Sequence, residues 1–185
     1  TVEDKELPIL YSGRINDEED TLKVTFEETI ENSWWSTRKT TFTFPEGVKP
    51  VDVTIDDVNG TLHNAALTDT AVDTGMVRID GNAVVLQNIP QAGAGDKAEF
   101  DMEVMVSIDP SFEGDITMTA GGAGVGDEQT VTVAKAVMPV KVTAEKNPVS
   151  IDYRNVAVSD ITVTESYAGA VESGESITLK VDNMR

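Results

Sequence analysis

The stretch that decides the fold is Phe100-Asp101-Met102-Glu103-Val104-Met105-Val106-Ser107-Ile108. Its even-numbered residues are all apolar, and most of its odd-numbered residues are acidic or polar. A period of two is typical of a β-strand that buries one side and exposes the other. We therefore expect a strand whose even-numbered side chains face a core, with Asp101 and Glu103 in water.

The same alternation recurs along most of the chain, and no stretch keeps a helical period. Turn residues separate the runs, and Asp80-Gly81-Asn82 predicts a hairpin between residues 76–79 and 83–89. Many short strands joined by such turns predict an all-β, antiparallel β-sandwich, either Ig-like or cohesin-like, with a closed barrel as the alternative. The other expected strands are residues 22–26, 41–44, 51–55, 116–120, 130–134, 137–143, 149–153, 161–164 and 177–181.

Composition narrows the classes of function. The 185 residues include 33 acidic and 14 basic side chains, a net charge of −19, with one histidine and no cysteine. Disulfides, Cys-based zinc sites and His clusters are thereby excluded, and nucleic acid or an anionic membrane surface is a poor partner for so acidic a chain. No apolar run approaches the roughly 20 residues of a membrane span, so we expect no membrane insertion. The chain begins without methionine, as a processed protein would, which is compatible with export. We expect an extracellular, cell-surface location.

Two segments align without gaps at a constant offset of 137 residues, Val24–Phe44 and Ile161–Val181. In each, an alternating strand is followed by a glutamate, a polar loop and a second alternating strand. We interpret this as a repeat whose second copy opens a module without completing it. The sequence then divides into 1–20, an N-terminal segment and candidate donor strand; 21–146, the sandwich; and 147–185, a C-terminal extension resembling the first strands of a second module.

Strands without a complete sheet expose an apolar face and an unpaired edge, so we expect a neighbouring copy to cover them. Addition of a strand between copies is head-to-tail and builds a filament or layer. An alternative is that the extension folds back onto its own sandwich. The N-terminal segment is a second candidate donor, although an ordinary first strand paired into its own sheet is the preferred interpretation of that segment. The residues predicted to form the interface are Leu7, Ile9, Tyr11, Ile161, Val163, Ile177, Leu179 and Val181.

A series of short phrases in fixed order carries a resemblance. They are Phe112–Gly122, Val131–Val140, Tyr153-Arg154-Asn155 and Ser159–Glu165 with Ala168-Gly169-Ala170. Together they resemble a β-rich surface module of secreted proteins from anaerobic Gram-positive bacteria, often found beside domains named for the copper amine oxidase N-terminus. The resemblance spans roughly residues 42–181 and implies a secreted cell-surface protein. It implies no amine oxidase activity, because the histidines that copper requires are missing.

Three further features bear on ligand binding or catalysis. The run Asp17-Glu18-Glu19-Asp20 offers oxygen ligands for calcium but lacks EF-hand spacing, so a solvated loop is the preferred interpretation and no cofactor is expected beyond calcium. Trp34 and Trp35 point to opposite faces if they lie on a strand, so one indole is free for an interface or a sugar. Paired carboxylates for a hydrolase carry no signal in a chain so rich in acids.

These observations favour a non-enzymatic, extracellular structural protein that polymerises with copies of itself. The alternative is a monomeric adhesion module that binds a cell-wall or plant polysaccharide through Trp34 or Trp35. A hydrolase with two acidic side chains is the third candidate.

Overall fold

The structure is a computed structural model of the whole chain, and it describes residues 6–16, 20–31, 39–59, 75–89, 97–122, 125–144, 160–171, 173–174 and 176–180. The chain divides into two compact units, Thr1–Val137 and Met138–Arg185. We call them unit 1 and unit 2 and describe each by itself. The boundaries predicted from the sequence, at 20/21 and 146/147, stay predictions.

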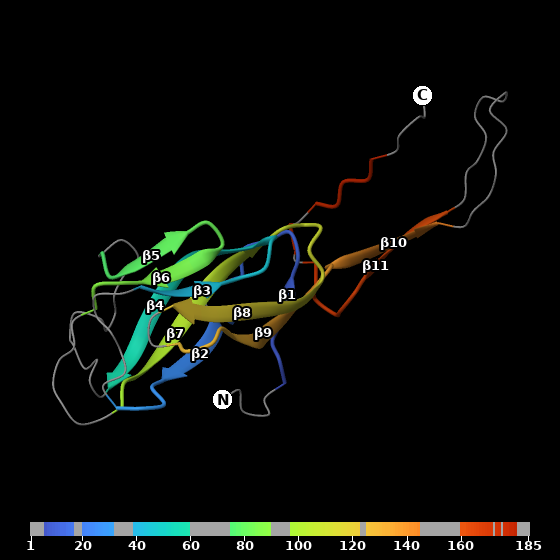
Figure 1. The fold of residues 1–185 in the computed structure, drawn as a ribbon. Helices are drawn as coiled ribbons and strands as arrows, with labels where there is room; N and C mark the ends of the chain where they lie inside the picture. The colour runs from blue at the N-terminus through green and yellow to red at the C-terminus, as the bar shows by residue number, and fades with distance from the viewer. Residues whose placement is uncertain are drawn as a thin grey trace. The chain divides into compact units, whose positions relative to one another are not determined.

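All regular elements in the described ranges are strands, eleven in number (Figure 1). Unit 1 contains the first nine, which are β1 (Ile9–Tyr11), β2 (Leu22–Glu27), β3 (Thr40–Thr43), β4 (Val48–Asn59), β5 (Val77–Asp80), β6 (Ala83–Leu86), β7 (Glu99–Ile108), β8 (Gly114–Gly122) and β9 (Gln129–Val137). Unit 2 contains β10 (Val140–Ala144) and β11 (Ile161–Glu165).

Unit 1 is a β-sandwich of two sheets. One sheet has six strands in the order β1-β9-β8-β3-β6-β5, and the other has three in the order β2-β7-β4. Figure 1 shows the two sheets as facing layers, with β7 running through the smaller one. The pairings within unit 1 are antiparallel except that of β1 with β9, which is parallel. The all-β sandwich predicted from the alternation is therefore confirmed.

The core lies between the two sheets and follows the predicted period of two. The even-numbered residues of β7, from Phe100 to Ile108, are all buried, and the odd-numbered residues Asp101, Glu103 and Met105 are more exposed. Phe42 on β3 and Phe26 on β2 meet edge to face, with ring centroids 6.1 Å apart, and Phe26 stacks on Phe100 at 5.1 Å. The contact of Phe26 with Phe42 joins the two layers, whereas Phe26 and Phe100 are neighbours within the smaller sheet.

The predicted hairpin at Asp80-Gly81-Asn82 is also present, because β5 and β6 pair from Asp80 opposite Ala83. Gly81 takes a φ of 65°, a conformation that glycine adopts without a steric penalty. The predicted strand 137–143 is different in the structure. β9 ends at Val137 and β10 starts at Val140, with Pro139 between them, since proline has no N–H to donate to a ladder.

The N-terminal segment is part of unit 1's own sheets. The Lys135 amide donates to the Pro8 carbonyl and the Ser12 amide to the Val137 carbonyl, both at 2.9 Å, which fixes β1 along β9. The chain then crosses to the smaller sheet, where Ile15 forms a bridge with Ser107. Leu10 is buried in the core, although the sequence analysis left it out, and Ile9 is exposed.

Unit 2 has a different character. Its described part contains one two-stranded antiparallel ladder, β10 with β11, and every described residue of β11 is exposed. Residues 176–180 follow as exposed chain that belongs to no strand. The prediction of a strand over 177–181 is thus wrong for residues 177–180, because no neighbouring strand supplies a ladder there; Val181 lies outside the described residues.

Candidate assembly surface

The candidate functional site is the exposed part of unit 2. We define the assembly surface as the β10–β11 ladder together with the C-terminal segment, residues 176–180. It contains four of the residues that the sequence predicted for the interface, and all four are exposed: Ile161 (47%), Val163 (37%), Ile177 (46%) and Leu179 (47%). The other predicted C-terminal interface residue, Val181, lies outside the described residues.

The register of the ladder separates an apolar face from a polar one. Val142 lies opposite Val163 and Ala144 opposite Ile161, and residues opposite each other in an antiparallel ladder share a face. The other face carries Lys141 opposite Thr164 and Thr143 opposite Thr162. Val142 is 48% exposed, so the apolar face is open to solvent on both strands. A two-stranded ladder with an open apolar face is marginally stable in water.

The C-terminal segment has the same alternation as a strand. Ile177 and Leu179 are the apolar residues, and Ser176 and Thr178 are polar. In the 137-residue repeat, Ile177 aligns with Thr40 and Leu179 with Phe42, which lie on β3 and are 0% and 1% exposed. β3 is a central strand of its sheet, because β6 pairs with one of its edges and β8 with the other. The C-terminal segment thus has the sequence of a core strand without its neighbours.

The glutamate of the repeat has a similar role in both copies. The Ala98 amide donates to Glu28 Oε2 at 2.8 Å, and the Glu28 amide donates back to the Ala98 carbonyl, also at 2.8 Å. The Val171 amide donates to Glu165 Oε1 at 3.1 Å. Glu28 is buried and its partner is 70 residues away, whereas Glu165 is exposed and its partner is six residues away. Each carboxylate accepts a backbone N–H, which agrees with the proposed repeat.

Two edge strands of unit 1 are protected against pairing with another chain. In β4, Pro50 lacks an N–H, the register shifts between Pro50 and Asp52, and Asp52 Oδ1 accepts the Val53 amide at 2.9 Å. β5 has only four residues and carries an ion pair between Arg78 and Asp80 at 3.3 Å. Proline, bulges, charges and short length are the devices by which proteins prevent edge-to-edge association. β11 is also short, with five residues, but between Ile161 and Thr164 it has no proline, bulge or charged side chain.

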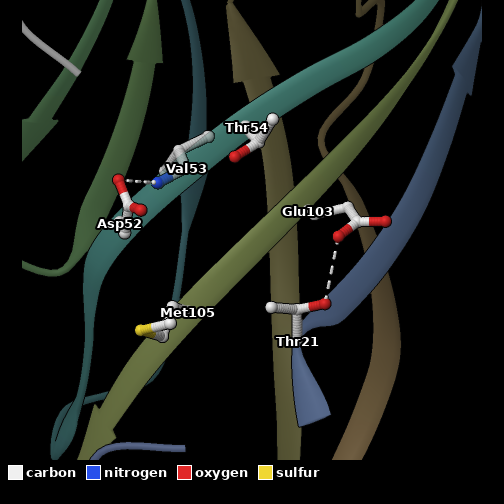
Figure 2. A pocket seen from close by; sticks show the side chains of 6 residues that line it. All are labelled: Thr21, Asp52, Val53, Thr54, Glu103 and Met105. Carbon is white, nitrogen blue, oxygen red and sulfur yellow. Dashed lines mark hydrogen bonds between the residues drawn. The ribbon is translucent and has the colours of Figure 1, made fainter. Parts of the chain in front are cut away.

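The outer face of the smaller sheet also has a hollow (Figure 2). It has a volume of about 330 Å³ and is lined by Thr21, Asp52, Val53, Thr54, Glu103 and Met105. Both of its carboxylates already have partners. Glu103 accepts hydrogen bonds from the Thr21 hydroxyl at 3.2 Å and from Lys23 Nζ at 2.7 Å, and Asp52 accepts the Val53 amide. These contacts account for both acids as parts of the sheet surface, and the Glu103 hydrogen bond raises the pKa of Lys23.

The remaining predicted sites lie mostly outside the described residues. The residues outside are Trp34 and Trp35, together with Asp17, Glu18 and Glu19 of the acidic run. The fourth acid of that run, Asp20, is described, and its backbone carbonyl accepts a hydrogen bond from the Asn16 side-chain amide at 2.6 Å. Over the described ranges, no three His, Cys, Asp or Glu side chains are grouped as metal ligands. The same ranges contain no helix with the length and apolar character of a membrane span. Calcium and polysaccharide binding therefore stay predictions.

Sequence reasoning missed one feature that bears on assembly. The run from Gln129 to Ala144 contains no aspartate or glutamate, although the chain has 33 such residues, and it carries Lys135 and Lys141. It covers β9 and β10, two strands with an edge that is at least partly unpaired in the described structure. The signal was present in the sequence as a gap in the distribution of acids.

Comparison with known proteins gives one structural similarity. No model of a protein family matches the sequence, and no curated protein matches it. Among solved structures, the chain is similar to the 35 kDa C-terminal fragment of the major pilin of Streptococcus agalactiae, with a TM-score of 0.39 and 11% sequence identity. The match covers 76% of this chain and 55% of that fragment, so the chain spans about half of its length.

Proposed function

We propose that this chain is an extracellular structural subunit, without enzymatic activity, that polymerises with copies of itself by β-strand addition into a surface filament or layer. One observation carries the proposal. Thr40 and Phe42 are buried in unit 1, and the aligned Ile177 and Leu179 are 46% and 47% exposed in unit 2. A second copy would provide the burial that they lack. The resemblance to secreted surface modules of Gram-positive bacteria supports the extracellular location.

Magnitudes favour strand addition over simple contact between apolar faces. Full burial of a Val, Leu or Ile side chain contributes about 1.5–3 kcal/mol, so each half-exposed side chain of the assembly surface has about 1 kcal/mol left to gain. Association costs about 4–15 kcal/mol, because each copy loses translational and rotational freedom. The free energy gained from side-chain burial alone is therefore close to that cost or smaller. A backbone ladder adds about 0.5–1.5 kcal/mol for each hydrogen bond, which brings the total gain into the range of that cost.

The test compares Val163→Lys with Thr162→Lys. Val163 lies on the apolar face of β11, whereas Thr162 is its neighbour on the polar face, and each substitution adds the same charge. Light scattering after size-exclusion chromatography and negative-stain microscopy would follow assembly. We expect polymers of the unmodified chain and of Thr162→Lys, and shorter or fewer polymers of Val163→Lys. An unmodified chain that stays monomeric at high concentration would overturn the proposal, whereas equal assembly of both variants would exclude the apolar face of β11 from the contact and leave the C-terminal segment as the part that joins copies.

A further inference from the structure

An open edge of unit 1 matches the C-terminal segment in length, pattern and charge. β9 has nine residues, but β1 pairs only with its last three, Lys135–Val137. Within the part of the chain that the structure describes, no strand pairs with the remaining outer edge of β9. A register shift between Ile116 and Thr117 on β8 leaves Val133 as the extra residue of a bulge. The regular part of the open edge is therefore Gln129–Thr132, which we call the β9 edge.

The β9 edge borders a side of the sandwich where apolar side chains of the core are only partly covered. β4 lies beside β5 and β6 at one side of the sandwich, and β2 lies beside β9 at the other. On this second side Val24, Phe26 and Val131 are only half-buried, although all three pack against the core. A strand added along the β9 edge would place alternate side chains next to them, because side chains of neighbouring strands in a sheet share faces.

The distribution of acidic residues indicates which part of a second copy could bind at the β9 edge. Copies with a net charge of −19 repel each other, so a contact between them is favoured where acids are absent. The β9 edge lies in the acid-free run from Gln129 to Ala144. The C-terminal segment, Ser176-Ile177-Thr178-Leu179-Lys180, is also free of acids and carries one lysine. Contact between these two segments brings no pair of like-charged acids together.

We infer that the β9 edge is the acceptor in the polymer and that the C-terminal segment of a second copy is the strand it receives. This inference rests on the proposed function and adds the identity of both partners. Ile177 and Leu179 would face the half-buried Val131, with Thr178 on the outer face beside Thr130 and Thr132. The Thr130 hydroxyl already lies 2.8 Å from that of Thr119 on the outer face, which fixes the orientation of β9. Four edge residues span about 13 Å, within the reach of a five-residue segment.

The absence of cysteine allows a direct test by disulfide trapping. Each single variant, Thr130→Cys, Thr132→Cys or Thr178→Cys, contains one thiol. A disulfide requires Cα atoms about 4.4–6.8 Å apart, so it forms only between direct neighbours. Copies with Thr178→Cys are assembled with copies carrying either β9 variant and then oxidised. We expect a mixed disulfide dimer on a denaturing gel with at least one β9 position, and little when Thr178→Cys is mixed with the control Arg78→Cys on β5.

The outcomes separate this inference from the proposed function. Polymers that form normally but give no mixed disulfide with either β9 position, or as much with Arg78→Cys, would overturn the choice of acceptor and leave the proposed function standing. A disulfide formed only within one chain, in the double variant Thr132→Cys/Thr178→Cys, would show that the C-terminal segment folds onto its own sandwich. Chains that never polymerise would overturn both.

Discussion

Val24–Phe44 and Ile161–Val181 share a sequence pattern, but the structure buries the described residues of one more than those of the other. Phe42 is 1% exposed, whereas Leu179, its counterpart in the repeat, is 47% exposed. Phe26 is half-buried between two aromatic rings, and its counterpart Val163 is exposed. The difference lies in the neighbours, since β2 pairs with β7 and β3 pairs with β6 and β8. Alternation therefore specifies which side chains can be buried, and partner strands decide whether they are.

The largest effect that tests this comparison is on the stability of unit 1. Phe42→Ala removes a fully buried ring and should lower the free energy of unfolding by about 3–5 kcal/mol. Leu179→Ala, at the matched position, should change the unfolding of the unassembled chain by less than about 0.5 kcal/mol, because its side chain is exposed. Urea denaturation followed by far-UV circular dichroism, which responds to the strands of both units, measures both. Equal losses would mean that Leu179 is buried in the isolated chain and that the two copies do not differ.

The glutamates of the repeat should show a smaller difference in the same direction. Glu28→Ala leaves the buried Ala98 amide without this acceptor, which should cost about 1–3 kcal/mol in unfolding free energy. Glu165→Ala removes an acceptor from an exposed amide that water can satisfy, so the cost should stay below about 0.5 kcal/mol. Both variants remove one acid and are matched in net charge. A cost for Glu165→Ala as large as that for Glu28→Ala would contradict the local, exposed role of Glu165.

The smallest of the expected effects is that of salt concentration, which should change the extent of assembly and not the free energy of unfolding. Raising the salt concentration from about 0.01 M to 1 M shortens the screening length from about 30 Å to about 3 Å and weakens repulsion between acidic copies. We expect the polymer fraction, measured by sedimentation, to rise with salt, because the proposed contact joins acid-free segments. Polymers that dissolve in salt would instead indicate ion pairs as the main contacts between subunits.

Much of the fold could be predicted from the sequence. The alternation in Phe100–Ile108 predicted the central strand and its buried face, and Gly81 marked the β5–β6 hairpin. The parallel pairing of β1 with β9 could not be predicted, because no local pattern encodes which distant strand a short terminal segment joins. The burial of Leu10 was missed for the same reason.

The candidate site was predicted less completely. The repeat pointed to Ile161, Val163, Ile177 and Leu179, and the structure leaves all four exposed. The strand expected at 177–181 is absent over 177–180 because a ladder needs a neighbour, which sequence periodicity does not supply. The protected edges of β4 and β5 were also beyond prediction, since protection depends on which strands end a sheet.

The central claim is that a neighbouring copy completes unit 2, and amide hydrogen exchange of monomers and polymers tests it most directly. In monomers we expect fast exchange in residues 176–180, because they belong to no ladder. In polymers we predict that exchange slows by at least tenfold in this segment and along Gln129–Thr132, with little change in the β7 core. Identical exchange of residues 176–180 in monomers and polymers would contradict the account.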